Sequence, residues 1–473
     1  MAKVVILGAG FSGQTAALYL RKKLNKQHEV IVINPWPRFT YIPSLVWVGV
    51  GQMEPEKTMF ELAPILGKKG IKFIQAWARE IHPDEQFVVT ESNNGTIQKV
   101  DYDYLINATG PHLNFEGTEG LGPDGGHSHS ICNNHHAKMA RDAYLETVER
   151  MKKGENVNIL IGTGHGQATC QGAALEYITN IHSDLVKRGL RDRAKIMWIS
   201  NEPALGDLGV GGIFAKKYGY IMKSEAFLKS LFAEQGLYYQ VQTAVKKVEK
   251  GKVIWENYEG ETGETEFDFA MLIPQFNGTR IKYINKDGED ITPKLTNPAG
   301  FMLVDGVYGK KWDDLKASDW PSTYQSPFYP NMFAAGIAFA PPGSISKPFV
   351  NKNGTVITAT APRTGMASGI IGKIVAFNIT DMIEGKSPSH HESMTEMPGA
   401  CIASIGKSTW NGSAATIVMH PVAPDYEKYP EYGRDLKVCD LEVGLAGAWL
   451  KRSLHTAFLY KMKGNIGWSF IPE

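Results

Sequence analysis

The feature that most constrains the fold is a glycine-rich turn between a strand and a helix. An apolar strand is predicted at Val4–Leu7, the turn spans Gly8–Gly13, and a helix is predicted over Gln14–Leu24. A second strand is predicted over Glu29–Ile33. Glycines at the first, third and sixth positions of the turn match the dinucleotide fingerprint: one shapes the turn, one admits a pyrophosphate and one lets helix and strand pack closely. The sequence therefore predicts a Rossmann-like unit with phosphates at the helix N-terminus.

The residue after the second strand departs from the usual fingerprint. An acid usually stands there to hold a ribose, and this chain has Asn34. An amide can hydrogen-bond a hydroxyl, but it lacks the strength that the charge of a carboxylate adds. We therefore predict a neutral contact between Asn34 and the ribose.

A second strand–turn–helix segment follows later in the chain. A strand is predicted over Asn156–Ile161, and the turn that begins at Gly162 leads into a helix. Gln167 occupies the third glycine position, and Cys170 is predicted in the first helical turns. A plain NAD(P)H site is the alternative interpretation, but the pattern is broken where its pyrophosphate would bind. The sequence favours a second Rossmann-like domain put to another use.

The composition excludes several classes of protein. The chain has 50 basic and 49 acidic side chains, so no overall field attracts nucleic acid. No uninterrupted apolar stretch approaches the length that spans a bilayer. The N-terminus enters a strand at once, without the charged lead and cleavage site of a signal peptide, so we expect a protein that is not secreted.

Four cysteines are scattered along the chain, at Cys132, Cys170, Cys401 and Cys439. None stands in a Cys-x-x-Cys pair, so neither a zinc ribbon nor an iron–sulfur site is expected, and we predict no metal. Taken singly, each is best explained as a small buried apolar residue.

The remaining pattern predicts an α/β protein in which one Rossmann-like dinucleotide-binding domain is interrupted by another. Leu105–Pro111 is a strand that ends in small residues, Met271–Gly278 returns the chain to the first domain, and Phe333–Ile337 is a further strand whose helix is supplied by Thr355–Asn378. Val307–Pro330 is expected to be an irregular surface insertion. The predicted divisions are 1–112 and 271–386 for the first domain, 113–270 for the second, and 387–473 for a C-terminal region.

The tail combines an apolar helical stripe with charge of one sign. From Val443 to Pro472 there is no acidic residue. The basic residues of this tail are Lys451, Arg452, Lys461 and Lys463. Apolar side chains recur at helical spacing at Leu445, Trp449, Leu454, Phe458 and Met462, with further aromatic rings at Tyr460 and Trp468. A helix packed on the core would show the same stripe. The one-sided charge and the aromatic rings favour an amphipathic helix in the lipid headgroup layer, with cations toward anionic lipid.

Two dinucleotide folds, one interrupted by the other, resemble the FAD-dependent disulfide reductase-like superfamily. Within it, the chain is similar to sulfide:quinone oxidoreductases over nearly its whole length. The segments that carry this resemblance are Phe39–Gly51, Asn201-Glu202-Pro203 with Leu208-Gly209, Gly336-Ile337, and Ala361-Pro362-Arg363-Thr364-Gly365. The three redox cysteines of that family have counterparts in Ser130-Ile131-Cys132, Ala168-Thr169-Cys170 and Gly399-Ala400-Cys401-Ile402. Cys439 matches nothing in this pattern and is expected to be structural.

The chain departs from the family pattern at three places. Arg363 replaces a lysine near the pyrimidine end of the flavin, which keeps the charge and changes its geometry. Asp207 stands where some members place a histidine near the point at which sulfide enters. Val307–Pro330 has no counterpart. The type of enzyme within the family is therefore left open.

The resemblance implies that sulfide is oxidised to polysulfide or sulfur, and that the electrons pass through FAD to a membrane quinone. It implies a bridge between Cys170 and Cys401, with Cys132 initiating or relaying sulfur. Glu176 corresponds to a family acid/base. His136 would exchange a proton with Cys132 if the segment between them is helical. Because the thiolate is the reactive form, we expect cations or helix N-termini to lower the cysteine pKa values.

The resemblance also implies a set of binding residues. The predicted FAD contacts are Gly8, Gly10, Phe11, Ser12, Gly13, Asn34, Pro43, Ser44, Ala76, Thr109, Gly110, Gly336, Ile337, Arg363, Thr364 and Gly365. The predicted quinone contacts are Pro43, Gly365 and Ile402, in an apolar pocket that the tail would cover. We expect a peripheral protein of the cytoplasmic membrane, with a dimer or trimer as the predicted assembly.

Three alternatives stay open from the sequence. A flavocytochrome-type sulfide dehydrogenase would lack the basic amphipathic tail and would normally be exported. A type-two NADH:quinone dehydrogenase would need an intact second glycine fingerprint and would have no use for three cysteines. A sulfane-sulfur carrier that keeps FAD as a structural element would not be an enzyme. The tail and the three cysteines together favour the sulfide:quinone hypothesis.

Overall fold

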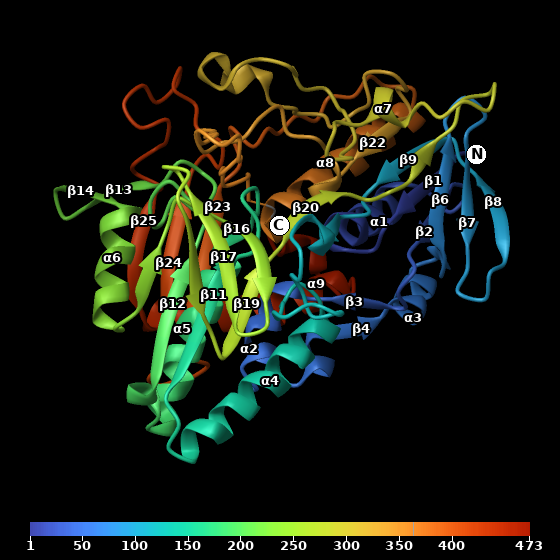
Figure 1. Ribbon diagram of the computed structural model, residues 1–473. Helices are drawn as coiled ribbons and strands as arrows, with labels where there is room; N and C mark the ends of the chain where they lie inside the picture. The colour runs from blue at the N-terminus through green and yellow to red at the C-terminus, as the bar shows by residue number, and fades with distance from the viewer. Residues whose placement is uncertain (363) are drawn as a thin grey trace.

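The computed structural model describes residues 1–362 and 364–473. Its first sheet has five parallel strands in the order β22–β9–β1–β2–β5 (Figure 1). These strands are β1 (Lys3–Leu7), β2 (Glu29–Ile33), β5 (Lys72–Ile74), β9 (Tyr104–Asn107) and β22 (Met332–Ala334). Since β22 lies next to β9, the chain returns to this sheet after a long excursion, as the sequence predicted.

The second parallel sheet lies beside the first and has the order β15–β12–β11–β19 (Figure 1). Its strands are β11 (Val157–Thr163), β12 (Ala194–Ile199), β15 (Tyr238–Gln240) and β19 (Phe269–Ile273). Both sheets are parallel and their inner strands are almost wholly buried, as in an α/β fold, which confirms that part of the fold prediction. The edge strands β5 and β15 are more exposed. The predicted domain boundary at residue 271 lies inside β19, so the chain leaves the second sheet only after Ile273.

The smaller sheets are antiparallel, apart from the pairing of β21 with β6. They comprise β16 (Thr243–Glu249) with β17 (Lys252–Asn257) and β18 (Thr262–Glu266); β6 (Trp77–His82) with β7 (Phe87–Glu91), β8 (Ile97–Asp101) and β21 (Lys282–Tyr283); and the pairs β3 (Arg38–Thr40) with β4 (Met59–Glu61), β10 (Pro111–Asn114) with β20 (Gln275–Gly278), and β13 (Phe214–Lys217) with β14 (Tyr220–Lys223).

The helices differ from the predicted ones at several ends. They are α1 (Phe11–Lys23), α2 (Leu45–Gly49), α3 (Leu62–Lys68), α4 (Asn134–Lys152), α5 (Gln171–Arg188), α6 (Ser224–Glu234), α7 (Thr292–Leu295), α8 (Gly365–Ile383) and α9 (Leu445–Met462). Helix α1 begins at Phe11 rather than Gln14, because Gly10 is already its cap residue. Helix α8 begins at Gly365 rather than Thr355: a residue before proline disfavours helix, and Ala361 precedes Pro362.

Helix α8 is mainly apolar, although Lys373 and Asp381 interrupt its apolar sequence. Among the described residues, it is the one helix that is long and apolar enough to cross a membrane. Its most apolar window is 61% buried within the protein, and it packs along α1. A Cβ at Gly372 would lie 2.4 Å from the carbonyl oxygen of Ser12, so the two helices meet at backbone distance. This is the packing of a core helix.

The C-terminal region joins the same core as the rest of the chain. Its sheet consists of β23 (Gly399–Ile405), β24 (Ser413–Met419) and β25 (Asp440–Gly444), and β23 packs against α5. The predicted tail helix is α9, but Lys451 and Lys461 are buried on its inner side rather than turned toward lipid. Both find carboxylate partners inside the protein, Glu176 and Glu473, which explains why these two cations face inward.

The predicted insertion Val307–Pro330 is irregular, as expected. Within it the structure has two short 3-10 turns, Trp312–Asp314 and Ala317–Asp319.

Candidate active site

The glycine turn after β1 is shaped to accept a phosphate group. A Cβ at Gly8, whose φ is +98°, would lie 2.3 Å from the Ala108 carbonyl oxygen, and a Cβ at Gly13 would lie 2.1 Å from the Gly8 oxygen. By contrast, a Cβ at Gly10 would meet nothing within 4 Å. No side chain caps the N-terminus of α1, so its first N–H groups are available to phosphate oxygens. The turn therefore fits the pyrophosphate of a dinucleotide such as FAD.

The other predicted FAD residues lie along one edge of the first sheet. Gly8 follows β1, Asn34 follows β2, Ala76 follows β5, Thr109 follows β9 and Gly336 follows β22. The carboxyl ends of parallel strands form the usual binding edge of such a sheet.

Asn34 already has two partners in the structure. Its Oδ1 accepts a hydrogen bond from the Ala9 amide at 3.1 Å, and its Nδ2 donates to the Trp36 carbonyl at 2.7 Å. The side chain therefore fastens the glycine turn to the end of β2, and its contact with the ribose stays a prediction.

Helices α1 and α8 meet near the end of β22, where we predict that the flavin binds. Gly336 has φ +66°, and a Cβ there would lie 2.5 Å from Ser12 Oγ. Thr364 is the residue just before α8 and makes no side-chain capping hydrogen bond, and Gly365 lies against the Phe11 ring. A mainly apolar pocket between these elements is lined in part by Gly336, Ile337, Ala361, Thr364 and Ser368. Of the predicted contacts, Arg363 lies outside the described residues.

Each predicted quinone residue is linked to helix α9 through a neighbouring residue or strand. Pro43 lies in the same short turn as Ser44, whose hydroxyl is 2.8 Å from the His455 ring of α9. Gly365 lies against Phe11, whose ring centroid is 6.1 Å from that of Phe458 on α9. Ile402 belongs to β23, which α9 also contacts. No sequence signal pointed to His455 as a neighbour of this site.

The three predicted redox cysteines gather around the start of α5. Cys170 is the cap residue of α5, with the left-handed angles φ 63° and ψ 35°. Cys401 Sγ lies so close to α5 that a Cβ at Gly172 would be 2.7 Å from it. The charge of Cys170 raises the pKa values of both Cys132 and Cys401, so it lies within electrostatic range of each. The fourth cysteine, Cys439, lies apart from them, with its sulfur 3.8 Å from the His420 carbonyl.

The expectation of lowered pKa values is wrong for two of these thiols. Burial raises the pKa of Cys132 to about 12, although a hydrogen bond from Ser130 opposes the shift. Burial also raises the pKa of Cys401 to about 12, with the charge of Glu176 adding to the rise and that of Lys451 opposing it. Removing a thiolate from water costs more free energy than one hydrogen bond or one nearby cation restores.

His136 does not have the relation to Cys132 that the sequence predicted. Helix α4 begins at Asn134, so Cys132 precedes the helix and the two residues are not one helical turn apart. The His136 ring instead lies 3.2 Å from Asp124, through Nε2 and Oδ2. Burial lowers the pKa of His136, and Asp124 opposes that shift. A catalytic role for His136 stays a prediction.

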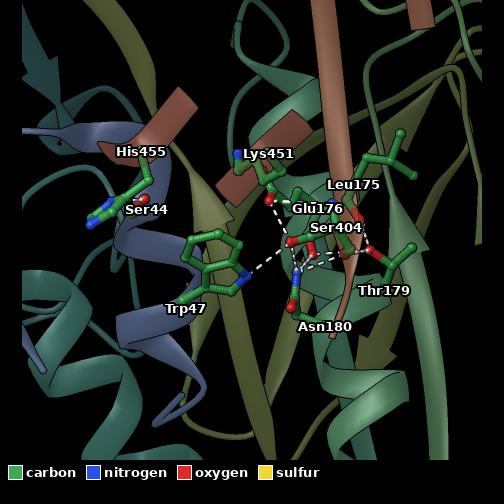
Figure 2. A network of polar contacts seen from close by, with 9 residues as sticks. All are labelled: Ser44, Trp47, Leu175, Glu176, Thr179, Asn180, Ser404, Lys451 and His455. Carbon is green, nitrogen blue, oxygen red and sulfur yellow. Dashed lines mark hydrogen bonds and ion pairs between the residues drawn. The ribbon is translucent and has the colours of Figure 1, made fainter. Parts of the chain in front are cut away.

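Glu176 lies at the centre of a buried polar network (Figure 2). Its Oε1 accepts hydrogen bonds from the Ser404 hydroxyl at 2.6 Å and the Ser404 amide at 3.2 Å. Its Oε2 lies 2.7 Å from Nζ of Lys451. Trp47 and Asn180 in turn donate to the Ser404 hydroxyl, at 3.0 and 2.9 Å. Glu176 and Lys451 therefore form a buried ion pair within electrostatic range of Cys401.

Sequence reasoning missed both partners of Glu176. Ser404 follows Cys401 by three residues on β23, and Lys451 was placed on a lipid-facing helix. The tail holds no acid between Val443 and Pro472, so no nearby residue signalled that Lys451 would need a buried carboxylate.

The fold, the phosphate turn and the cysteine cluster together define a flavoprotein of the disulfide oxidoreductase class. In agreement, the family described as pyridine nucleotide-disulphide oxidoreductase matches residues 2–164. The sulfide-quinone reductase of Aquifex aeolicus is 31% identical over 99% of this chain and 94% of its own length. The X-ray structure of the sulfide:quinone oxidoreductase from Aquifex aeolicus superposes with a TM-score of 0.78 at 29% identity, covering 99% of this chain and 94% of that one.

A second relative comes from a eukaryote. The mitochondrial sulfide:quinone oxidoreductase of Schizosaccharomyces pombe is 22% identical over 81% of this chain and 75% of its own. The chain belongs to the sulfide:quinone oxidoreductase family, whose members are FAD-dependent.

Proposed function

We propose that this chain oxidises sulfide to polysulfide or sulfur through a bridge between Cys170 and Cys401 and reduces a membrane quinone. The observation that carries the proposal is the gathering of Cys132, Cys170 and Cys401 at the start of α5. Three cysteines that lie far apart in the sequence have no common structural purpose there, whereas sulfur transfer needs them together.

The sulfur step follows from thiol–disulfide chemistry. Sulfide attacks the Cys170 sulfur of the bridge, an S–S bond forms there, and Cys401 leaves as a thiolate when the old S–S bond breaks. Bound FAD supplies the two-electron acceptor. Further sulfide then attacks the outer sulfur held on Cys170 and releases polysulfide, with the Cys170 thiolate as the leaving group. The Cys170 and Cys401 thiolates would re-form the bridge by giving two electrons to bound FAD. Cys132 initiates or relays this sulfur.

The network around Glu176 controls the charge on Cys401. Lys451 lowers the pKa of Cys401 against the burial that raises it, so it stabilises the leaving thiolate. Glu176 holds Lys451 in place and is the candidate acid/base for protons in this region.

The FAD residues that follow the first-sheet strands, together with Gly10, Gly13 and α8, form the proposed cofactor site. We assign 1–112 and 274–386 to this unit, 113–273 to the interrupting domain and 387–473 to quinone and membrane contact. The position of β22 beside β9 supports this division.

Exposed apolar side chains of the C-terminal region, rather than its cations, support contact with a membrane. These are Trp410, Trp449, Leu450, Tyr460, Ile466 and Phe470, all between 42% and 96% exposed. Apolar and aromatic side chains are stabilised at the boundary between the lipid headgroups and the acyl chains. We propose that this face lies on the cytoplasmic membrane and that quinone reaches Pro43, Gly365 and Ile402 beneath α9. A dimer or trimer would set these faces in one plane.

The test is anaerobic stopped-flow absorbance of the FAD-loaded protein. Sulfide should bleach the flavin band and a short-chain quinone should restore it, while Cys401→Ser should lose the sulfide step. Bleaching by NADH with no response to sulfide would contradict the proposal and favour a type-two NADH dehydrogenase. Bleaching by sulfide with no recovery in quinone would favour a haem acceptor.

A further inference from the structure

Cys170 has a backbone conformation that an L-residue rarely adopts. Its φ of 63° and ψ of 35° place it in the left-handed region at the cap of α5, and it is not a glycine. A non-glycine residue persists there only when its surroundings hold it in place, and such residues concentrate at functional sites. The surroundings of Cys170 should therefore contain a specific restraint.

The restraint is the side-chain amide of Asn201, which is wholly buried just after β12. Its Nδ2 donates to the carbonyl oxygens of Gly166 and Ala168 at 3.1 and 3.0 Å, both in the turn that leads to Cys170. Its Oδ1 accepts a hydrogen bond from Nε2 of Gln171, the residue after Cys170, at 3.0 Å. One amide thus holds the chain on both sides of the cysteine.

The same amide also holds a segment from the other side of the site. Nδ2 of Asn201 lies 3.2 Å from the carbonyl oxygen of Thr358, in the extended stretch that leads to α8. Two further bonds join that stretch to the cysteine turn: Thr169 Oγ1 donates to the Ala361 carbonyl at 2.9 Å, and the Thr358 amide donates to the Gly166 carbonyl at 2.8 Å. Asn201 therefore sits where the cysteine turn meets the segment before α8.

The chemistry of the contacts fixes the orientation of this amide. Three carbonyl oxygens converge on Nδ2, and only a donor is favourable there. Turning the amide over would place its oxygen against those carbonyls and its nitrogen against the Nε2 donor of Gln171. A carboxylate at this position would have no hydrogen to offer.

We propose that Asn201 is a positioning residue that fixes the direction of the Cys170 sulfur relative to the segment before α8. This inference rests on the proposed function, because it assumes that Cys170 transfers sulfur beside a flavin bound near α8. Asn201 does not touch the reacting atoms. It affects the geometry of one half-reaction, the reduction of the flavin by sulfide.

The test compares Asn201→Asp, which has nearly the same shape, with the wild-type FAD-loaded protein. We expect the limiting rate of flavin bleaching by sulfide to fall about 10²-fold, the effect of a displacement of about 1 Å at a reacting group. The rate at which a short-chain quinone reoxidises dithionite-reduced flavin should stay unchanged, because that step does not use Cys170. A purely structural role would not separate the two half-reactions in this way.

Asn378→Asp is the matched control. Asn378 is a wholly buried amide of α8 that exchanges two hydrogen bonds of 2.9 Å with the His390 backbone, away from the cysteines. If both variants slow both half-reactions alike, or if Asn201→Asp bleaches at the wild-type rate, the positioning role is overturned.

Two more variants complete the test. If Asn201→Asp does not fold, Gln171→Met removes only the donor to Asn201 Oδ1 and to the Ala168 carbonyl, and should slow bleaching about tenfold by the same displacement argument. An unchanged bleaching rate in Gln171→Met would then overturn the role. Cys170→Ser separates the proposed function from the role of Asn201. If sulfide bleaches the flavin of Cys170→Ser at the wild-type rate, the proposed function is refuted. If Cys170→Ser loses bleaching while Asn201→Asp bleaches normally, only the role of Asn201 is refuted.

Discussion

The ammonium group of Lys451 lies 2.7 Å from a carboxylate oxygen of Glu176, and each side chain is only 7% exposed. The pair joins α9 to α5, 275 residues apart in the chain, and both of its charges act on Cys401. A buried ion pair of this kind adds little net stability over an apolar pair, but breaking it leaves an uncompensated charge.

Lys451→Met should be strongly destabilising. It leaves the Glu176 carboxylate buried without its cation, which costs about 3–5 kcal/mol in the apparent free energy of unfolding. The double variant with Glu176→Gln should recover most of that loss, because the uncompensated charge is removed as well. Urea unfolding of the two single variants and the double variant would measure this coupling. If the losses simply add, the pair is not coupled in solution.

The thiol of Cys401 should react slowly at neutral pH. Removal from water raises the pKa of Cys401 from 9.0 to about 12, so its thiolate fraction at pH 8 is about 10³-fold below that of a free thiol. Alkylation of Cys401 by iodoacetamide in the reduced protein should fall by a similar factor and should rise with pH up to about pH 12. Mass spectrometry of the modified peptide provides the measurement.

The same shift affects stability, with a definite sign. A raised folded-state pKa contributes stability below the unfolded-state pKa, and that contribution is lost as the pH rises through the folded-state value, here between about 9 and 12. Cys401→Ser removes the titrating group, so the loss of stability over this range should be smaller in that variant. Alkylation of Cys401 as fast as a free thiol at pH 8 would contradict both expectations.

Replacing either of two glycines of the phosphate turn by alanine should impair a different property, stability in one case and FAD binding in the other. Gly13→Ala puts a Cβ 2.1 Å from the Gly8 carbonyl oxygen, so the turn must move and the protein should lose thermal stability even without FAD. Gly10→Ala meets no protein atom within 4 Å, so the apoprotein should keep its melting temperature. Its FAD affinity should nevertheless fall, because the methyl group occupies the approach of the pyrophosphate. Calorimetry of the apoproteins and FAD titration measure the two effects, and normal FAD affinity in Gly10→Ala would place the phosphates elsewhere.

The exposed apolar tail residues should govern binding to vesicles. Ile466→Ser combined with Phe470→Ser removes side chains that are 96% and 89% exposed, and should weaken sedimentation with phospholipid vesicles by about tenfold or more. Activity with a water-soluble quinone analogue should stay unchanged. Tyr218→Ser is the matched control, because Tyr218 is 92% exposed on the turn between β13 and β14. Equal weakening by Tyr218→Ser would show that the tail is not the specific contact.

The sequence was sufficient where structure is local. The strand, turn and helix around Gly8–Gly13 were predicted because the glycine spacing is itself the geometric requirement. The start of α8 was misplaced because residues before Ala361 are kept extended by distant partners, as where the Thr358 amide bonds to Gly166. The cysteine pKa values were misjudged because burial is a property of the packed molecule. The inward turn of Lys451 was missed because its partner lies on another element.

Helix α9 has consequences for how the protein responds to its surroundings. Trp449 and Leu450 are exposed on it, and Lys451, the very next residue, reaches inward to Glu176. Within a regular helix these side chains are held at fixed angles to one another. Lys451 and its two exposed neighbours therefore share one rigid backbone element. The helix that presents Trp449 and Leu450 at the surface is also the helix that holds the cation paired with Glu176.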